Sequence, residues 1–168
     1  GGGAGTLNLT ATELGKLANG FTSITIGDAT SGAVDVNSST FTDPVTIVGD
    51  SIVVTALGAG ANGVTLTAQG AGGITDGGDG GTDITGGAVT LTANAGAIGA
   101  PEDAISLDSV SLTTSTTGGG NQFLSEAGAT SVTSVNAGGA ELDIRGGEFD
   151  LSSAAIANGD GIYVASGA

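Results

Sequence analysis

A near-identical repeat in the middle of the sequence constrains the fold more than any other feature. One copy, VTLTAQGAGGI, begins at Val64, and the second, VTLTANAGAIG, begins at Val89. Five consecutive positions are identical, and an amide follows in both copies, Gln69 and Asn94. Repeats of about 20–30 residues built from short strands are typical of solenoids, in which each repeat stacks on its neighbours. We therefore expect stacked coils of parallel strands.

Short stretches of alternating apolar and polar residues recur along the whole chain, bounded by Gly, Asn, Asp or Ser. A short helix is expected near residues 11–18, where Thr10 and Glu13 form a capping-box pattern and Leu14 and Leu17 share a face. The strands are predicted at residues 6–10, 21–26, 33–36, 44–48, 51–57, 63–68, 88–93, 104–114, 129–135, 140–144, 148–153 and 161–166.

The composition agrees with thin, regular layers. Gly makes up 34 of 168 residues and aromatics only 3 %, so the core must be built from Val, Ile, Leu and Ala. We predict an all-β fold, a parallel β-helix (β-solenoid) of roughly seven or eight coils at about 22 residues per coil. Residues 1–168 are expected to form a single solenoid segment of a longer repeat protein. An antiparallel sandwich also uses many short strands, but it does not predict near-identical units repeated at the spacing of Val64 and Val89.

The charge balance excludes several classes of partner. Two basic residues stand against 17 acidic ones, giving a net charge of −15. Nucleic-acid binding needs Lys and Arg to neutralise phosphates, and anionic membrane surfaces impose the same need. Cys and His are absent, which removes disulfides, thiolate sites and imidazole ligands. Neither a spanning run of about 18 apolar residues nor a signal-peptide pattern is found.

The stretch GGITDGGDGGTDITGG, residues 72–87, raises the question of a metal site. It resembles the Gly/Asp-rich nonapeptide that binds calcium in β-rolls, although Thr82 stands where that pattern has Asp. Asp76, Asp79 and Asp83 are the candidate calcium ligands, and a connecting turn without metal is the alternative. A phosphate site is not expected, because the loop has no cation and leads into a strand. Pro101-Glu102-Asp103 is interpreted as a solvated turn.

Two further motifs have ordinary explanations. GAGANG, residues 58–63, matches G-x-G-x-x-G, but a strand follows it where a dinucleotide site needs a helix. It is interpreted as a turn. The pairs Thr65/Thr67 and Thr90/Thr92 form a T-x-T array, which on a flat face can order water and bind ice. Only two clear copies are found, and Thr is also a common exposed strand residue.

An enzyme is not expected. Glycoside hydrolases need two carboxylates about 5–10 Å apart, for which Asp143 with Asp150, or Asp35 with Asp43, are the available pairs. Arg145 is expected to form a salt bridge with Glu141, Glu148 or Asp143, and aromatic residues for stacking sugars are few. We predict no catalytic and no cofactor-binding residues.

FTSITIGDATSGAVDVNSSTFTDPVTIVG, residues 21–49, followed by the VTLTA units, resembles the passenger region of large bacterial exoproteins. These are the filamentous-haemagglutinin-like proteins of two-partner secretion and their autotransporter relatives. The resemblance implies a right-handed β-helix at the bacterial cell surface or outside the cell, used as an adhesin stalk, fibre or matrix component. The family's N-terminal secretion domain is not in this sequence.

The expected function is thus a non-enzymatic structural or adhesive solenoid segment of a large secreted or surface protein. Its expected partners are further repeats or copies of the chain and host or matrix glycans. One alternative is a filament subunit that stacks through uncapped solenoid ends. A second alternative is a carbohydrate-binding or carbohydrate-cleaving β-helix.

Overall fold

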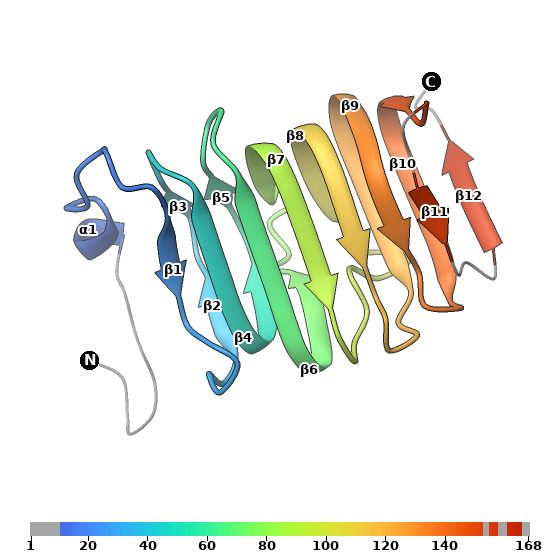
Figure 1. The fold of residues 1–168 in the computed structure, drawn as a ribbon, viewed down its shortest axis with the longest axis horizontal. Helices are drawn as coiled ribbons and strands as arrows, with labels where there is room; N and C mark the ends of the chain where they lie inside the picture. The colour runs from blue at the N-terminus through green and yellow to red at the C-terminus, as the bar shows by residue number, and fades with distance from the viewer. Residues whose placement is uncertain (1–10, 153–154, 158–160, 166–168) are drawn as a thin grey trace.

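The computed structural model describes residues 11–152, 155–157 and 161–165, which form an elongated stack of coils (Figure 1). The strands wind around a narrow core, and α1 lies at the N-terminal end of the stack. The elements are α1 (Ala11–Leu14), β1 (Ile24–Ile26), β2 (Val34–Val36), β3 (Ser39–Thr40), β4 (Val45–Val54), β5 (Leu57–Gly58), β6 (Val64–Asp76), β7 (Ile84–Ala93), β8 (Ile105–Ser115), β9 (Gln122–Asn136), β10 (Glu141–Asp150), β11 (Ala155–Ala157) and β12 (Gly161–Ala165).

The strands pair in parallel, coil on coil, and align apolar residues into columns. Val64 of β6 pairs with Val45 of β4 on one side and with Val89 of β7 on the other, as the sequence repeat predicts. Successive members of this column are unevenly spaced along the chain, yet from Val45 onward each is at most 1 % exposed. The column is Ile24, Val45, Val64, Val89, Leu112 and Val132.

Two other faces contribute columns of their own to the same core. The second runs through Val34, Ile52, Ile74, Ile98, Gln122 and Leu142. The third runs through Leu57, Ile84, Leu107 and Glu126. The core is thin, but it is repeated in every coil. Full burial of each Val, Leu or Ile contributes about 1.5–3 kcal/mol to the stability of the fold. The polar members Gln122 and Glu126 both belong to β9, and a third polar residue, Ser39 of β3, pairs with Leu57 at the start of the last column.

The predicted parallel β-solenoid is confirmed, but it has about six turns, so the expectation of seven or eight coils was too high. The estimate divided the whole chain by one coil length, whereas the first sheet strand begins only at Ile24. In the segment before β1, α1 contacts β3 at the N-terminal end of the stack.

The helix is also shorter than the predicted 11–18. It ends at Leu14, and three-residue turns follow, in which the Lys16 and Leu17 amides donate to the Glu13 and Leu14 carbonyls. Leu14 packs into the core, but Leu17 is 37 % exposed, so the two side chains do not share a buried face. Gly15 explains the early end, because glycine costs about 1 kcal/mol in a helix.

Several strands predicted separately are continuous in the structure. Residues 44–48 and 51–57 fall largely in β4, which changes register between Gly49 and Ser51 as it bends from one face to the next. In the same way β10 contains most of 140–144 and the first half of 148–153. The strand predicted at 6–10, which includes the capping residue Thr10, lies outside the described residues.

In the described part of the chain, no helix is long and apolar enough to cross a membrane.

Candidate functional site

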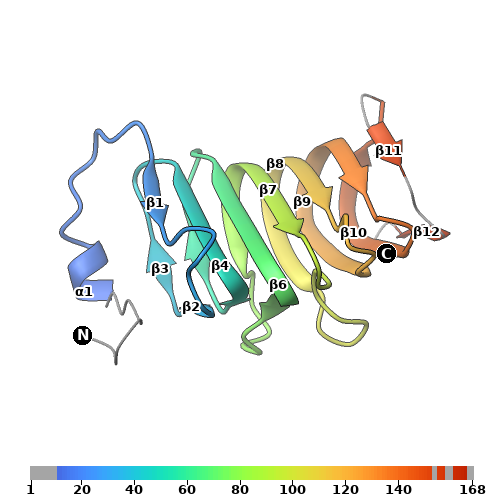
Figure 2. The same ribbon diagram turned by 60° about the horizontal axis from the view of Figure 1, so that its bottom comes forward.

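The acidic loop connects β6 to β7 and protrudes at the lower edge of the solenoid in Figure 2. Asp76 is the last residue of β6, and Asp83 immediately precedes β7. The coil that contains the loop, from Val64 to Val89, is the longest in the first apolar column, and the loop accounts for its extra length. Gly78 and Gly80, both at positive φ, allow the tight path, and open space surrounds their Cα atoms.

Asp83 is held rigidly although it belongs to a loop. Its N–H donates to the Ser106 carbonyl at 2.9 Å, and its carbonyl accepts from the Leu57 N–H at 2.7 Å. Its Oδ2 accepts from the Ser106 N–H at 2.7 Å. The residue is fully buried, and its Oδ1 atom has no hydrogen-bond partner in the structure. The coils on both sides therefore fix the backbone of Asp83, and Ser106 also holds its carboxylate, while one carboxylate oxygen is left unsatisfied.

Asp76 and Asp79 each stabilise the turn that follows them. Asp76 Oδ1 accepts from the Gly78 N–H at 2.7 Å, and Asp79 Oδ1 accepts from the Gly81 N–H at 2.9 Å. Both are side chain–backbone turns of the type that Asp favours, closing over two residues. Each such bond uses one carboxylate oxygen, so the second oxygen of each residue can contact another group.

The three predicted residues come together. One carboxylate oxygen from each of Asp76, Asp79 and Asp83 lies within 4.8 Å of the other two. Burial raises the pKa of Asp83 to about 7, and contact with Asp76 and the charge of Asp79 add to this, against the opposing Ser106 hydrogen bond. Burial alone would raise the pKa of Asp76, but its bond from Gly78 and its contacts with Asp83 and Asp103 lower it overall. Asp83 and Asp76 therefore have opposite shifts.

A fourth carboxylate reaches this group from the next coil. Asp103 follows the Pro101–Glu102 turn, which the mutual backbone hydrogen bonds of Ala100 and Asp103 close. The turn is exposed, as predicted, yet contact with the Asp76 carboxylate raises the pKa of Asp103. Sequence reasoning treated this turn separately, because nothing in the sequence shows that consecutive coils place the two loops side by side.

A second polar group, buried in β9, was not predicted. Gln122 occupies a core position and is fully buried. Its Oε1 accepts from Thr114 Oγ1 at 2.6 Å, and its Nε2 donates to Thr116 Oγ1 at 3.0 Å and to the Asn136 carbonyl at 2.8 Å. These bonds satisfy the amide, so the group stabilises the core and leaves no donor or acceptor for a ligand.

Glu126 forms a similar closed network at a corner of the coil. It is 2 % exposed, and both its carboxylate oxygens accept from Ser109, from the N–H at 2.9 Å and from Oγ at 2.7 Å. Ser109 Oγ also lies 2.9 Å from Thr130 Oγ1. A glutamate in the apolar alternation of QFLSEAGATSV is the sequence signal that could have revealed this group.

The column of outward threonines spans more coils than the sequence indicated. Thr65 and Thr90 pair in register, as predicted, but the column continues in both directions. It comprises Thr25, Thr46, Thr65, Thr90 and Thr113. The neighbouring column is less regular and comprises Val48, Thr67, Thr92 and Ser115. A search at the fixed offset between the two VTLTA units misses most of the first column, because the coils differ in length.

The carboxylate pairs considered for hydrolysis are engaged elsewhere. Asp143 forms an ion pair with Arg145, as predicted, through the guanidinium Nε and Nη2 atoms. Asp150 lies beyond the bend of β10 and accepts from the Ser152 N–H at 2.9 Å. Among the described residues, Asp150 lines a shallow hollow together with Ala129, Thr130, Ser131 and Phe149.

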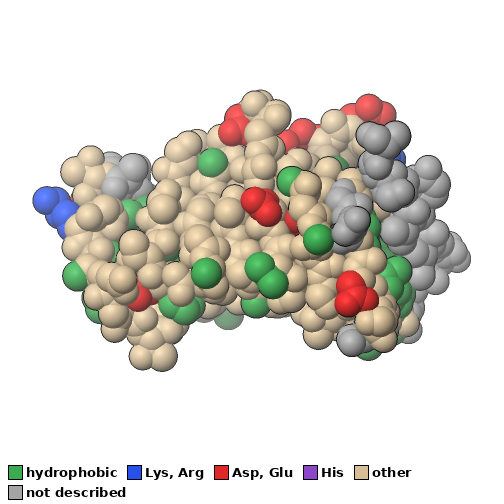
Figure 3. Space-filling view, turned by 90° about the horizontal axis from the view of Figure 1, so that it is seen from above, with side chains coloured by type: hydrophobic (Ala, Val, Ile, Leu, Met, Phe, Trp, Pro, Cys, Tyr) green, Lys and Arg blue, Asp and Glu red, His purple; other side chains and the backbone are tan. Residues whose placement is uncertain are grey.

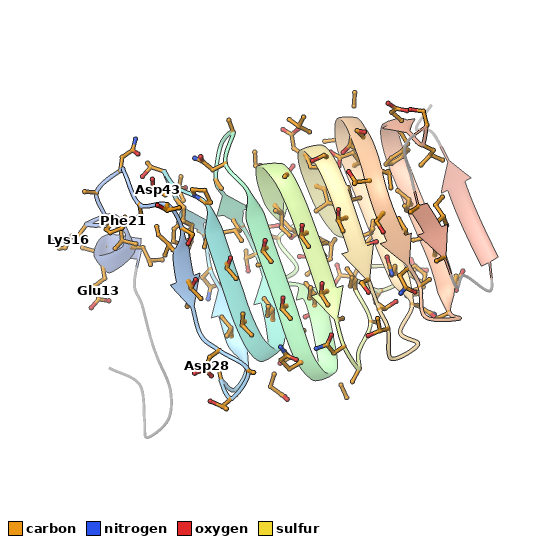
Figure 4. The ribbon with its side chains drawn as sticks, viewed as in Figure 1. Glu13, Lys16, Phe21, Asp28 and Asp43 are labelled. Carbon is orange, nitrogen blue, oxygen red and sulfur yellow. The ribbon has the colours of Figure 1, made fainter. Side chains whose placement is uncertain are left out.

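The other pair lies at the N-terminal end. Asp43, labelled in Figure 4 close to Phe21, is buried and accepts from the Gly20 N–H at 2.9 Å, which holds the segment before β1 against the coil. Asp35 is exposed in β2 and accepts from the side-chain amide of Asn37 at 3.0 Å.

GAGANG forms the turn between β5 and β6, as predicted, with the Asn62 N–H donating to the Ala59 carbonyl.

Comparison with known proteins found no protein-family model, curated protein or solved structure that matches this chain.

Proposed function

We propose that this chain is a non-enzymatic structural or adhesive segment of a larger secreted or surface protein, of the kind that filamentous-haemagglutinin-like exoproteins contain. The observation that supports this most is the apolar column from Ile24 to Val132, which keeps its register through coils of different length. A column of this kind gives every coil the same core contacts. Such a solenoid acts as a rod whose length is set by its number of coils.

The surface chemistry suits a spacer or stalk. Outward Thr and Ser columns keep the face hydrated, and a net charge of −15 opposes side-by-side association of rods. On the face seen in Figure 3, acidic side chains are dispersed along the length and do not gather in one groove. This distribution supports a structural surface more than a substrate-binding cleft.

A filament subunit is the second candidate, supported by the N-terminal coil. In the described part of the chain, β1 and β2 each pair with β4 alone, so one edge of each strand has no strand partner. Phe21, just before β1, is 50 % exposed. An unpaired edge beside an exposed aromatic could accept the last coil of another copy.

Cell-surface labelling tests the proposed function. An antibody against the recombinant chain should label intact cells of the source organism, and external protease should remove the label. On an immunoblot the antigen should migrate far above the 15.6 kDa of this chain. Antigen found only after lysis, or a band at the size of the chain alone, would refute the proposal. For the isolated chain, light scattering separates a rod from a filament subunit, which forms fibres as concentration rises.

A further inference from the structure

We propose that the loop from Asp76 to Asp83 binds one Ca²⁺ ion through the carboxylates of Asp76, Asp79 and Asp83. One oxygen from each lies within 4.8 Å of the other two, close enough for a single cation to contact all three. The inference concerns the stability and assembly of the coil and does not depend on the proposed function.

The unsatisfied oxygen of Asp83 is the independent observation that points to a ligand. Asp83 is fully buried, and Oδ1 has no hydrogen-bond partner, while Oδ2 is bonded to the Ser106 N–H. A buried carboxylate oxygen without a partner is costly, because it has lost its hydration and gained nothing in return. A cation at the centre of the three carboxylates would restore the lost interaction.

The loop is already organised to present these oxygens. Hydrogen bonds from Gly78 and Gly81 hold the Oδ1 atoms of Asp76 and Asp79, which leaves their Oδ2 atoms available. Asp83 is held in place, because its backbone is bonded to both Leu57 and Ser106 and its Oδ2 accepts from the Ser106 N–H. A site whose ligands are fixed before binding loses little conformational entropy on binding.

The chemistry of the ligand set selects Ca²⁺. Every available ligand is a hard oxygen, and the sequence contains neither His nor Cys, which the softer transition metals prefer. Three carboxylates, with Asp103 beside Asp76, also carry more negative charge than a hydrated Mg²⁺ usually recruits from protein. Backbone carbonyls of the glycine-rich loop and water would complete the six to eight oxygens that Ca²⁺ takes.

Binding would join two coils. Asp76 ends β6, whereas Asp83 is bonded to Ser106 of β8, so one ion would tie the loop to strands on both sides of it. Mutual repulsion among the acidic side chains, which opposes this arrangement without metal, would become attraction to the ion. Calcium should therefore raise the stability of the solenoid.

The test is calcium titration of the metal-free protein by calorimetry, combined with thermal unfolding. One ion per chain should bind, and the melting temperature should rise by about 3–6 °C when free Ca²⁺ is ten times its dissociation constant. Asp79→Asn is the informative variant, because Asp79 is exposed and its loss should leave the metal-free fold intact. It should weaken binding at least tenfold, and Asp83→Asn should abolish it.

Asp108→Asn is the matched control, since Asp108 is exposed and lies outside the loop. It should bind Ca²⁺ like the wild type. The proposal is overturned if the wild type shows no saturable binding, if Asp79→Asn binds as tightly as the wild type, or if Mg²⁺ produces the same shift at the same concentration. Asp108→Asn weakening binding as much as Asp79→Asn would also overturn it, because only the overall charge would then matter.

Discussion

Asp83 and Ser106 are bonded twice although they lie in different coils: the Ser106 N–H donates to Asp83 Oδ2 at 2.7 Å, and the Asp83 N–H donates to the Ser106 carbonyl at 2.9 Å. The second bond is of the same kind that stacks one coil on the next throughout the solenoid. The carboxylate of the candidate site is therefore held by the stacking itself. Substitutions in the acidic loop should therefore change the stability of the neighbouring coils.

The stability of the metal-free protein should depend on pH through Asp83. With a pKa of about 7, folded Asp83 keeps its proton over a range in which the unfolded chain, with an Asp pKa near 4, has lost it. Because the folded state binds more protons in that interval, the free energy of unfolding should fall as pH rises from about 4 to about 7 and level off above. Urea unfolding in chelator at pH 4.5, 5.5, 6.5 and 7.5 would measure this.

Asp83→Asn isolates the contribution of that carboxylate, because the variant cannot titrate at this position. Its unfolding free energy should change less across the same pH range. The lowered pKa values of Asp28 and Asp150 act below about pH 4, whereas Asp103, whose pKa is also raised, is present in both proteins. Equal pH slopes for the wild type and Asp83→Asn would contradict the prediction.

Gln122→Ala should destabilise the protein by about 2–4 kcal/mol. The change removes the partner of Thr114 and Thr116, both at most 1 % exposed, and leaves a cavity in the core. Gln69→Ala is the control, since Gln69 lies on the outside and its hydrogen bond to Asn94 is exposed. That control should change the unfolding free energy by about 0.5 kcal/mol or less. Chemical denaturation gives both values, and similar losses would argue against the buried network.

Leu91→Ala tests the apolar core. Leu91 is fully buried between Leu66 and Thr114 in adjacent strands, so its truncation should cost about 2–5 kcal/mol. Val110, which is 70 % exposed, provides the comparison, and Val110→Ala should be nearly neutral. If Leu91→Ala unfolds at the same denaturant concentration as Val110→Ala, the side chain does not face the core.

Alanine substitutions at Gly73 and Gly60 distinguish the effect of backbone conformation from the effect of close packing between coils. Both have positive φ, +66° and +56°, so alanine strains the backbone at either position by about 1–2 kcal/mol. A Cβ at Gly73 would lie 2.1 Å from the Ala97 carbonyl oxygen of the next coil, whereas at Gly60 it would meet nothing within 4 Å. Gly73→Ala should therefore lower the melting temperature clearly more than Gly60→Ala. Equal effects would mean that the coils are not packed so closely there.

The sequence predicts the stacking well where coils have equal lengths and poorly where they differ. Val64 and Val89 each begin an identical run of five residues, so their pairing could be predicted. The pairing of Val45 with Val64 could not, because that coil is shorter and shares few identical positions with the next. Coil length depends on excursions at the corners, and the register shift between Gly49 and Ser51 is set by packing that no local pattern encodes.

The candidate site, too, could be predicted from the sequence only in part. Asp76, Asp79 and Asp83 were predicted together, because a short glycine-rich loop cannot take them far apart. The approach of Asp103 could not be predicted, since it depends on which loops share a corner of successive coils. Gln122 and Glu126 were missed, because a polar residue in a strand usually faces solvent, and only the structure shows the hydroxyl and amide partners that make burial possible.

The most direct test of the solenoid is cross-linking of Thr65 to Thr90, which pair in adjacent coils. The protein has no cysteine, so paired cysteine variants report on one contact alone. Adjacent strands lie about 4.8 Å apart, within the range of a disulfide, whereas Thr65 and Thr113 are two coils, or about 10 Å, apart. On mild oxidation, Thr65→Cys/Thr90→Cys should form an intramolecular disulfide and Thr65→Cys/Thr113→Cys should keep two free thiols. Failure of the first pair, or equal cross-linking of the second, would contradict the parallel stacking on which the account rests.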